Sequence, residues 1–165
     1  KGAQMFTIIE ADLNNENHAN AYLSLMSHYA CDPMGGNEDL SDYAKQNLVS
    51  SLLKRVDVTI LIAFKDDQPA ALLTAIEGFS TFACKPLFNI HDVVVFKAFR
   101  GLGLSNQLFA EIEKIAKQRG YCKITLEVLE GNEIAKNAYA KQGFSDYQLD
   151  PSQGSALFWT KSLKG

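Results

Sequence analysis

The sequence lacks the features that mark disulfide-rich, zinc-binding, membrane-spanning and nucleic-acid-binding proteins. Its 165 residues include three cysteines, Cys31, Cys84 and Cys122, and no two of them form a CxxC pair. This spacing argues against a disulfide framework or a metal site, and it predicts free, buried thiols in a reducing compartment. No run approaches about 18 consecutive apolar residues, so no membrane-spanning helix is expected. A net charge of −3 also lacks the basic excess that nucleic-acid binding usually needs. These absences predict a cytoplasmic protein that uses no metal, membrane or nucleic acid.

The length of 165 residues suits one domain. Residues 1–4 precede the first methionine, Met5, and look like added sequence, so one domain is expected over residues 5–165. Hydrophobic residues make up 47% of the chain and charged residues 21%, which is typical of a globular protein and argues against disorder.

The hydrophobic periodicity indicates helices and strands that interleave without strict alternation. Helices are expected over residues 17–29, after an N-cap at Ser41, over 104–119 and over 133–142. Strands are expected over residues 6–10, 57–65, 70–79, 88–96 and 123–129, with a closing pair over 144–148 and 156–161. This order predicts an α/β fold with a mixed, mostly antiparallel central sheet flanked by helices.

The stretch VVVFKAFRGLGLSNQLF, from Val93, passes from an apolar strand through Gly101 and Gly103 into a helix. It contains no GxxxxGK[ST] phosphate loop, and Asn106 stands where a dinucleotide fingerprint needs its third glycine. Two interpretations stay open from the loop alone. The amides of residues 101–106 and the helix dipole could bind a diphosphate, or the glycines could simply make a tight turn.

The same stretch resembles the acetyl-CoA-binding motif [QR]-x-x-G-x-[GA] of the GNAT N-acetyltransferases, with Arg100, Gly103 and Ser105 at the named positions. Ser105 departs from the usual glycine or alanine, but it is small and exposes its amide. Downstream, LEVLEGNEIAKNAYAKQGF is similar to the next motif of that family. Its matching residues are Asn132, Tyr139, Gly143 and Phe144. The resemblance covers about residues 58–161, and residues 79–143 are most similar to the diamine acetyltransferase branch.

The resemblance implies a GNAT-like fold that binds acetyl-CoA and often forms dimers, so a homodimer is compatible with it. The implied cofactor-binding residues are Val93, Val94, Val95, Arg100, Gly101, Leu102, Gly103, Leu104, Ser105, Asn106, Asn132 and Ala135. The implied activity is transfer of an acetyl group to a primary amine of a small molecule, such as a polyamine, diamine or amino acid. The alternative is a CoA-binding sensor or regulatory module without catalysis.

Acetyl transfer to an amine needs a base, a stabilised oxyanion and an acid for the leaving thiolate. The motif assigns the acid to Tyr139, although a half-buried helix tyrosine would be an ordinary structural residue. His91 occupies the position of a glutamate in the diamine branch, so it is expected to be the base or to hold a water that relays the proton. Asp92, the third candidate catalytic residue, is expected to orient a neighbour or to contact the substrate amine. It would face away from His91 in a regular strand, and a β-bulge would change that.

The loop over residues 31–42 is acidic and contains no basic residue. Its carboxylates Asp32, Glu38 and Asp39 are expected to attract a cationic amine acceptor, or else to form an ordinary solvated loop. His18 and His28 lie outside every motif and are expected to be solvated helix residues.

Overall fold

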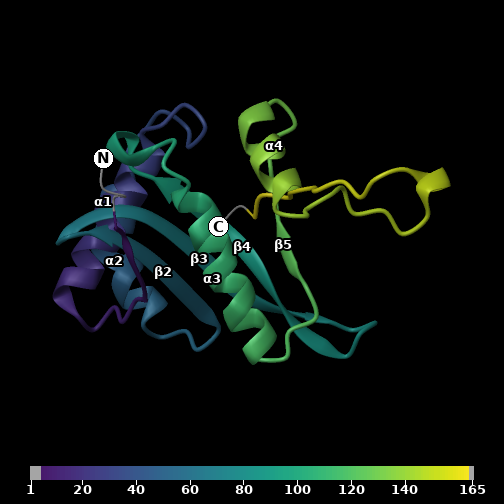
Figure 1. Cartoon of the computed structure of the whole chain (residues 1–165), viewed down its shortest axis with the longest axis horizontal. Helices are drawn as coiled ribbons and strands as arrows, with labels where there is room; N and C mark the ends of the chain where they lie inside the picture. The colour runs from purple at the N-terminus through teal and green to yellow at the C-terminus, as the bar shows by residue number, and fades with distance from the viewer. Residues whose placement is uncertain (1–4, 164–165) are drawn as a thin grey trace. The chain divides into compact units, whose positions relative to one another are not determined.

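The computed structural model describes residues 5–163, so the predicted added residues 1–4 lie outside the described part (Figure 1). The contacts divide the chain into two compact units that meet between Leu126 and Glu127. The first unit contains β1 (Thr7–Glu10), α1 (Glu16–Ala30), α2 (Asp42–Leu52), β2 (Val58–Lys65), β3 (Gln68–Ser80), β4 (Lys85–Val95), a 3-10 turn (Lys97–Phe99), α3 (Leu104–Gln118) and β5 (Ile124–Leu126). The second contains α4 (Glu133–Lys141) and a 3-10 turn (Pro151–Gln153).

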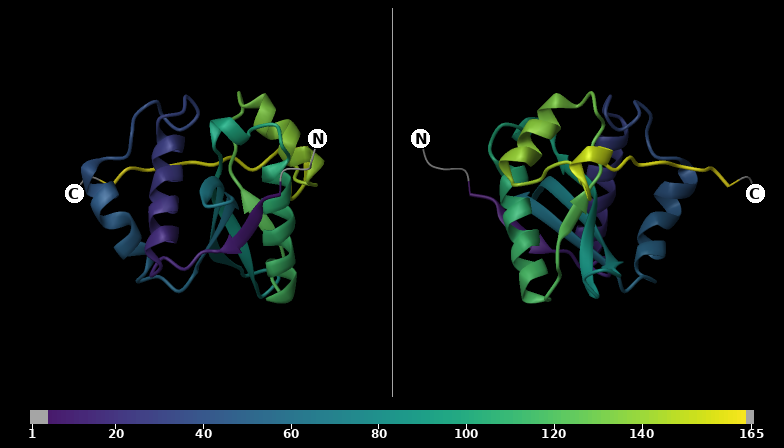
Figure 2. Two further views of the ribbon diagram at one scale, coloured as in Figure 1. Left: turned by 60° about the vertical axis from the view of Figure 1, so that its left-hand side comes forward. Right: turned by 90° about the vertical axis from the view of Figure 1, so that its right-hand side faces the viewer.

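The five strands form one sheet in the order β1-β2-β3-β4-β5. All neighbouring pairs are antiparallel except β4 and β5, which run parallel. Helices α1 and α2 lie on one face of this sheet and α3 lies on the other (Figure 2). The predicted α/β class and the mixed, mostly antiparallel sheet with flanking helices are therefore confirmed.

Apolar side chains from both helical layers anchor the helices to the sheet. On the α1 face, Tyr22 and Leu25 pack into a buried cluster with residues of β2, β3 and β4, including Leu72 and Val94. On the other face, α3 buries the side chains that its periodicity predicts: Leu104, Leu108, Ile112 and Ile115. Helix α2 begins at the predicted N-cap, where Ser41 Oγ accepts a hydrogen bond from the amide of Ala44 at 3.1 Å.

Strand β4 carries one extra residue relative to β3. Thr74 is paired with Asp92 and Ala75 with Ile90, so His91 has no partner of its own and forms a β-bulge. Directly paired residues share a face of the sheet. Because Leu72 and Val94 are paired and belong to the α1 cluster, Thr74 and Asp92 also lie on the α1 face, while Ala75 and Ile90 lie on the α3 face. In a regular strand Ile90 and Asp92 would share a face, so the bulge at His91 is what brings Asp92 to the α1 face.

Pairing between β4 and β5 stops early. It covers only Phe88, Asn89 and Ile90 of β4, whereas pairing with β3 continues to Val95. Beyond the bulge, the edge of β4 away from β3 therefore has no strand partner among residues 5–163.

The closing strand pair over 144–148 and 156–161 is a wrong prediction, because the structure has no strand in either segment. The 3-10 turn between them contains Pro151, which has no amide hydrogen to donate, and it ends at Gly154 with φ +82°. One backbone hydrogen bond, from Ala156 N to Tyr147 O at 2.8 Å, links the two segments. The strand predicted over 123–129 is also shorter, since β5 ends at Leu126.

The three cysteines are free, as predicted, but all three are exposed, so the prediction of buried thiols is wrong. Each lies at the end of an element rather than inside one: Cys31 caps α1, Cys84 is in the β3–β4 turn with φ +49°, and Cys122 precedes β5. Within residues 5–163, no helix is both long and apolar enough to cross a membrane.

Deleting His91 should remove the bulge and leave every other β3–β4 pair in place. We expect this deletion to lower the free energy of unfolding by less than about 1 kcal/mol, measured by urea denaturation. Deleting Val93 is the matched control, because it places Asp92 opposite Leu73 on the α3 face. Burying that carboxylate under α3 should cost more than roughly 3 kcal/mol. Equal losses in the two variants would contradict the assigned register.

Candidate functional site

The loop between β4 and α3 has the backbone of an anion cradle. Gly101 and Gly103 adopt left-handed conformations with φ of +78° and +75°, which a side chain would strain. Gly103 is the N-cap of α3 and offers no side chain to cap the helix. The first bond of this helix runs from Gln107 N to Gly103 O, so the amides of Leu104 and Ser105 have no acceptor one turn back. An anion placed here would meet those amides and the positive end of the helix dipole.

Arg100, the first residue of the predicted motif, is tied to two other parts of the first unit. Its guanidinium donates to Val95 O at 3.3 Å and to the Asp32 carboxylate at 2.9 Å. Asp32 also accepts a hydrogen bond from the amide of Met34, and this bond, followed by the one from Arg100, lowers the pKa of the Asp32 carboxyl. Asp32, which the sequence predicts to attract an amine, is thus ion-paired with Arg100, next to the glycine loop.

The acidic loop after α1 is partly neutralised by cations from outside it. Besides the Asp32 pair, Asp39 forms a 2.6 Å ion pair with Lys45 of α2, which lowers the pKa of Asp39. Glu38 is exposed. Two of the three carboxylates predicted to recognise the acceptor are therefore paired, which weakens the long-range attraction of this loop for a cation.

The bulge places the Asp92 carboxylate on the α1 face, where its charge influences two tyrosines of α1. Burial raises the pKa of Asp92, while the Thr74 hydroxyl and His91 act in the opposite direction. Tyr22 is 2% exposed, and burial, together with the charge of Asp92, raises its pKa to about 12. Burial and then Asp92 likewise raise the pKa of Tyr29. Asp92 is therefore half-buried under α1, whereas His91 is exposed on the bulge itself.

His28 is not the solvated helix residue that the sequence predicts. Its ring stacks on Phe96 with centroids 4.3 Å apart and an angle of 15° between the rings, and its Nε2 atom is buried. Burial, followed by the charge of Arg100, lowers the pKa of His28, so the neutral imidazole is favoured. His18 contributes to a turn, because its Nδ1 atom accepts a hydrogen bond from the amide of Asp12 at 3.1 Å.

The free edge of β4 presents backbone groups next to Asp92. The amide of Phe96 donates a hydrogen bond to Ala70 O of β3. Because backbone groups alternate in direction along a strand, those of Val94 also point toward β3, whereas those of Val93 and Val95 point away from it. The bond from Arg100 to Val95 O fits this direction. Of the three valines predicted to meet the cofactor, two therefore point their amides to the open edge and one belongs to the β3 ladder.

The second unit holds the other motif residues around α4. Asn132 is the N-cap of this helix, and its side chain accepts a hydrogen bond from the amide of Ala135 at 3.1 Å. Tyr139 packs edge-on against Phe144, with ring centroids 6.2 Å apart. Gly143, with φ +89°, ends the helix as predicted, and Phe144 N bonds to Tyr139 O. The asparagine, tyrosine, glycine and phenylalanine of the motif thus build one local helical structure.

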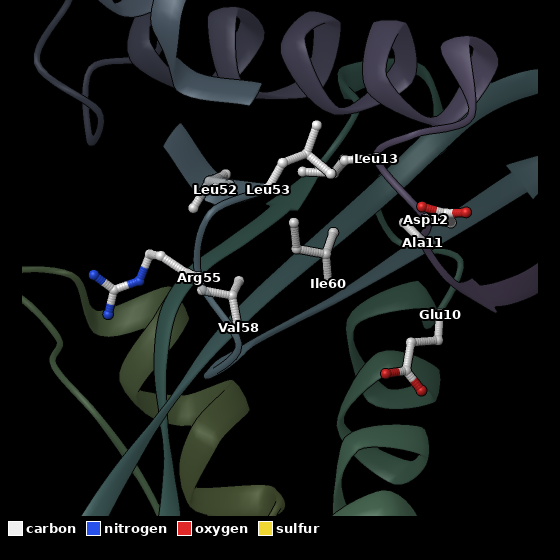
Figure 3. Close-up of a pocket in the computed structure, with 9 residues that line it drawn as sticks. All are labelled: Glu10, Ala11, Asp12, Leu13, Leu52, Leu53, Arg55, Val58 and Ile60. Atoms are coloured by element: carbon white, nitrogen blue, oxygen red, sulfur yellow. The ribbon is translucent and has the colours of Figure 1, made fainter. Parts of the chain in front are cut away.

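A small open pocket lies at the beginning of β2 and contains none of the predicted site residues (Figure 3). Its volume is about 160 Å³, and its charged lining residues include Glu10 and Arg55. Both are already paired, Glu10 with Arg119 at 2.9 Å and Arg55 with both oxygens of Asp57. This pocket offers a ligand few unpaired charges.

Sequence reasoning missed Tyr22, Tyr29, Thr74 and His28 as neighbours of the site. Tyr22 and Tyr29 are seven residues apart and therefore share a face of α1, which the periodicity does show. No sequence pattern indicated which β4 side chain this face would meet, because that depends on the bulge.

An open mixed sheet whose fourth strand passes through a glycine turn into a helix defines an α/β protein with a loop whose geometry suits an anion. The model of the acetyltransferase (GNAT) family matches residues 22–144, most of the chain. The chain therefore belongs to the GNAT family of acetyltransferases, whose members generally use acetyl-CoA as the acetyl donor. No curated protein sequence matches the chain significantly.

Solved structures show the same fold at low sequence identity. A possible acetyltransferase from Clostridium difficile 630 has a TM-score of 0.75 and 19% identity over 96% of this chain and 99% of that one. AAC(6')-Iy, in complex with the bisubstrate analogue CoA-S-monomethyl-acetylneamine, has a TM-score of 0.74 and 16% identity over 96% and 99% of the two chains. Glucosamine-6-phosphate N-acetyltransferase from Arabidopsis thaliana has a TM-score of 0.70 and 17% identity over 97% and 99%.

Replacing Asp92 by asparagine should stabilise the fold near neutral pH. A carboxyl whose pKa is raised in the folded state contributes stability when protonated and loses it as the pH rises through the folded pKa. Asp92→Asn removes that loss, so we expect the Tm to rise by roughly 1–4 °C near neutral pH. The gain should shrink as the pH approaches about 4, where the aspartate is also neutral.

Asp67→Asn is the control for this comparison, because Asp67 lies exposed in the β2–β3 turn and its replacement should change the unfolding free energy by less than about 0.5 kcal/mol. A lower Tm for Asp92→Asn near neutral pH would show that the carboxylate is better solvated or better paired than its surroundings indicate.

Proposed function

We propose that this protein transfers the acetyl group of acetyl-CoA directly to a primary amine of a small molecule, in the class of polyamines, diamines, amino acids and amino sugars. The observation that carries the proposal is the half-buried Asp92 carboxylate beside the open edge of β4, in the strand that leads into the glycine turn. Two of the similar structures carry amine-related names, an acetylneamine bisubstrate analogue and a glucosamine 6-phosphate N-acetyltransferase, which supports an amine as acceptor.

The glycine loop between β4 and α3 suits the diphosphate of coenzyme A. Residues 101–106 combine two left-handed glycines with the uncapped N-terminus of a 15-residue helix, which is the arrangement that binds phosphates in many proteins. Leu104 is buried and fixes the first turn of α3 to the sheet, so the amides are held in place before the ligand arrives. When bound, acetyl-CoA supplies the activated thioester. Asn132 and Ala135 are assigned to the cofactor by the family motif.

The amine must lose a proton before it attacks. An amine with a pKa near that of lysine is about 3.4 units above neutral pH, so deprotonation costs roughly 4.6 kcal/mol. A carboxylate whose pKa is raised by burial is a stronger base than an exposed one, which favours Asp92 for this role. His91 follows the predicted family position and, being exposed, is suited to pass the proton to solvent.

The remaining steps are assigned from the open edge of β4 and from the family motif. The amides of Val93 and Val95 point to this edge, where they can donate to the oxygen of the thioester as it gains charge. Tyr139 is assigned to protonate the departing thiolate, because a phenol keeps its proton at neutral pH. The amine nitrogen forms the new bond to the acetyl carbon, and the carbon–sulfur bond breaks.

The proposal predicts turnover, measured as release of free CoA thiol from acetyl-CoA with a panel of spermidine, glucosamine 6-phosphate, sisomicin and free amino acids. At least one amine should raise thiol release well above the rate of thioester hydrolysis. Asp92→Asn should lower kcat/KM at least about 100-fold with little effect on the affinity for CoA, since a general base contributes 10²–10⁴-fold.

Tyr139→Phe separates the enzyme from its alternative, the non-catalytic CoA-binding module. In an enzyme it should lower kcat at least about tenfold and leave CoA binding by calorimetry unchanged. CoA binding without turnover across the panel would instead favour the sensor, and the absence of CoA binding would contradict both.

A further inference from the structure

Thr74 is a buried hydroxyl in an otherwise apolar part of β3. The strand reads Pro-Ala-Ala-Leu-Leu-Thr-Ala-Ile over residues 69–76, and Thr74 is only 3% exposed. A hydroxyl in such a position is costly unless it has a hydrogen-bond partner, and a valine of the same shape would avoid the cost. The presence of threonine here therefore points to a polar neighbour that uses it.

The register identifies that neighbour. Thr74 is paired directly with Asp92 across β3 and β4, next to the bulge, and both side chains lie on the α1 face. Tyr22 of α1 lies over the same spot, buried to 2% exposure. Thr74, Asp92 and Tyr22 thus meet where α1 covers the two central strands, which is also where the proposed base must be held.

The Thr74 hydroxyl is placed to interact with both Asp92 and Tyr22. No partner among residues 5–163 meets Thr74 Oγ1 at full hydrogen-bonding geometry. Nevertheless the hydroxyl is close enough to Asp92 and to Tyr22 to lower the pKa of both groups. A hydroxyl both donates and accepts, so Tyr22 can donate to Thr74 while Thr74 donates to Asp92. The cost of leaving a buried hydroxyl unpaired favours such a bond.

We propose that Thr74 is a positioning residue of the acetyl transfer, whose hydroxyl donates a hydrogen bond to the Asp92 carboxylate and holds that base on the α1 face of the sheet. This inference rests on the proposed function, in which Asp92 removes the proton of the amine. The titratable groups that face Asp92 are Tyr22 and Tyr29 from α1 and His91 from β4. Both tyrosines are neutral near pH 7, so neither offsets the charge of the carboxylate, and the hydroxyl paired with it on the sheet side is that of Thr74.

Thr74→Val tests this role in two ways. Losing the donor should raise the pKa of Asp92 further, because a hydrogen bond to the charged form favours that form. The first measurement is the pH titration of the Asp92 carboxyl carbon by NMR, which needs no acceptor. The second is the pH profile of kcat/KM with acetyl-CoA and the amine of the panel above that turns over fastest. Its acidic limb should move to higher pH, with a loss of roughly three- to tenfold on that limb and less than about twofold on the plateau.

Two variants make the result specific. Thr74→Ser keeps the hydroxyl and should restore both the titration and the profile. Thr59→Val is the matched control: Thr59 is also 3% exposed, but it lies on β2 and accepts a hydrogen bond from Arg119 at 2.9 Å. This control removes a buried threonine hydroxyl elsewhere in the sheet and should move neither curve.

The outcomes separate this inference from the proposed function. If Asp92→Asn abolishes turnover but Thr74→Val leaves the Asp92 titration unchanged, Thr74 does not hold the base and the inference is wrong. If the titration moves but the acidic limb does not, Thr74 contacts Asp92 without acting in the reaction, which also overturns it. If no amine turns over in the wild type, the proposed function fails first, whatever the titration shows.

Discussion

The extra residue in β4 is the constraint on which the candidate site depends. One unpaired position, His91, reverses the faces of everything that follows it in the strand. It moves Asp92 from the α3 face to the α1 face, and it brings the amides of Val93 and Val95 to the edge that β5 leaves open. The proposed base and the two proposed oxyanion donors thereby lie a few residues apart on one strand, ahead of the loop that is suited to a diphosphate.

This arrangement keeps an ionisable carboxylate where burial disfavours its charged form. Asp92 is half-buried on the α1 face, near enough to Tyr22 and Tyr29 for its charge to raise the pKa of both. Functional residues commonly carry such a cost, because a base that is well solvated and well paired removes protons poorly. The apolar packing of Leu25, Leu72 and Val94 around the site is what allows the fold to tolerate the charge.

The ion pair between Arg100 and Asp32 links two loops that the sequence treats as separate. It joins the turn after α1, expected to lie over the acceptor, to the turn before α3, expected to bind the donor. Arg100 also donates to Val95 O. Its bonds therefore connect the end of β4, the glycine loop of residues 101–106 and the turn after α1. The carboxylate of Asp32 thus contributes to the shape of the site more than to its charge.

Much of the fold follows from local patterns in the sequence. The α3 face of Leu104, Leu108 and Ile112, the Ser41 cap and the glycine turn are set by residues within one helical turn of each other, so periodicity and turn chemistry find them. The bulge, and the contacts of Asp92 with Thr74 and Tyr22, depend on the pairing of residues far apart in the chain. The strand predicted around Trp159 was wrong because the β-propensity of a segment does not show whether a neighbouring strand is there to pair with it; this segment is exposed.

The central claim is that coenzyme A binds where β4 passes into α3. An amide ¹⁵N NMR titration with CoA tests it most directly. The account predicts that the largest shifts occur at residues 101–106, with further shifts at Val93 and Val95. Shifts confined to the pocket around Glu10 and Arg55, or no saturable shifts at all, would contradict it.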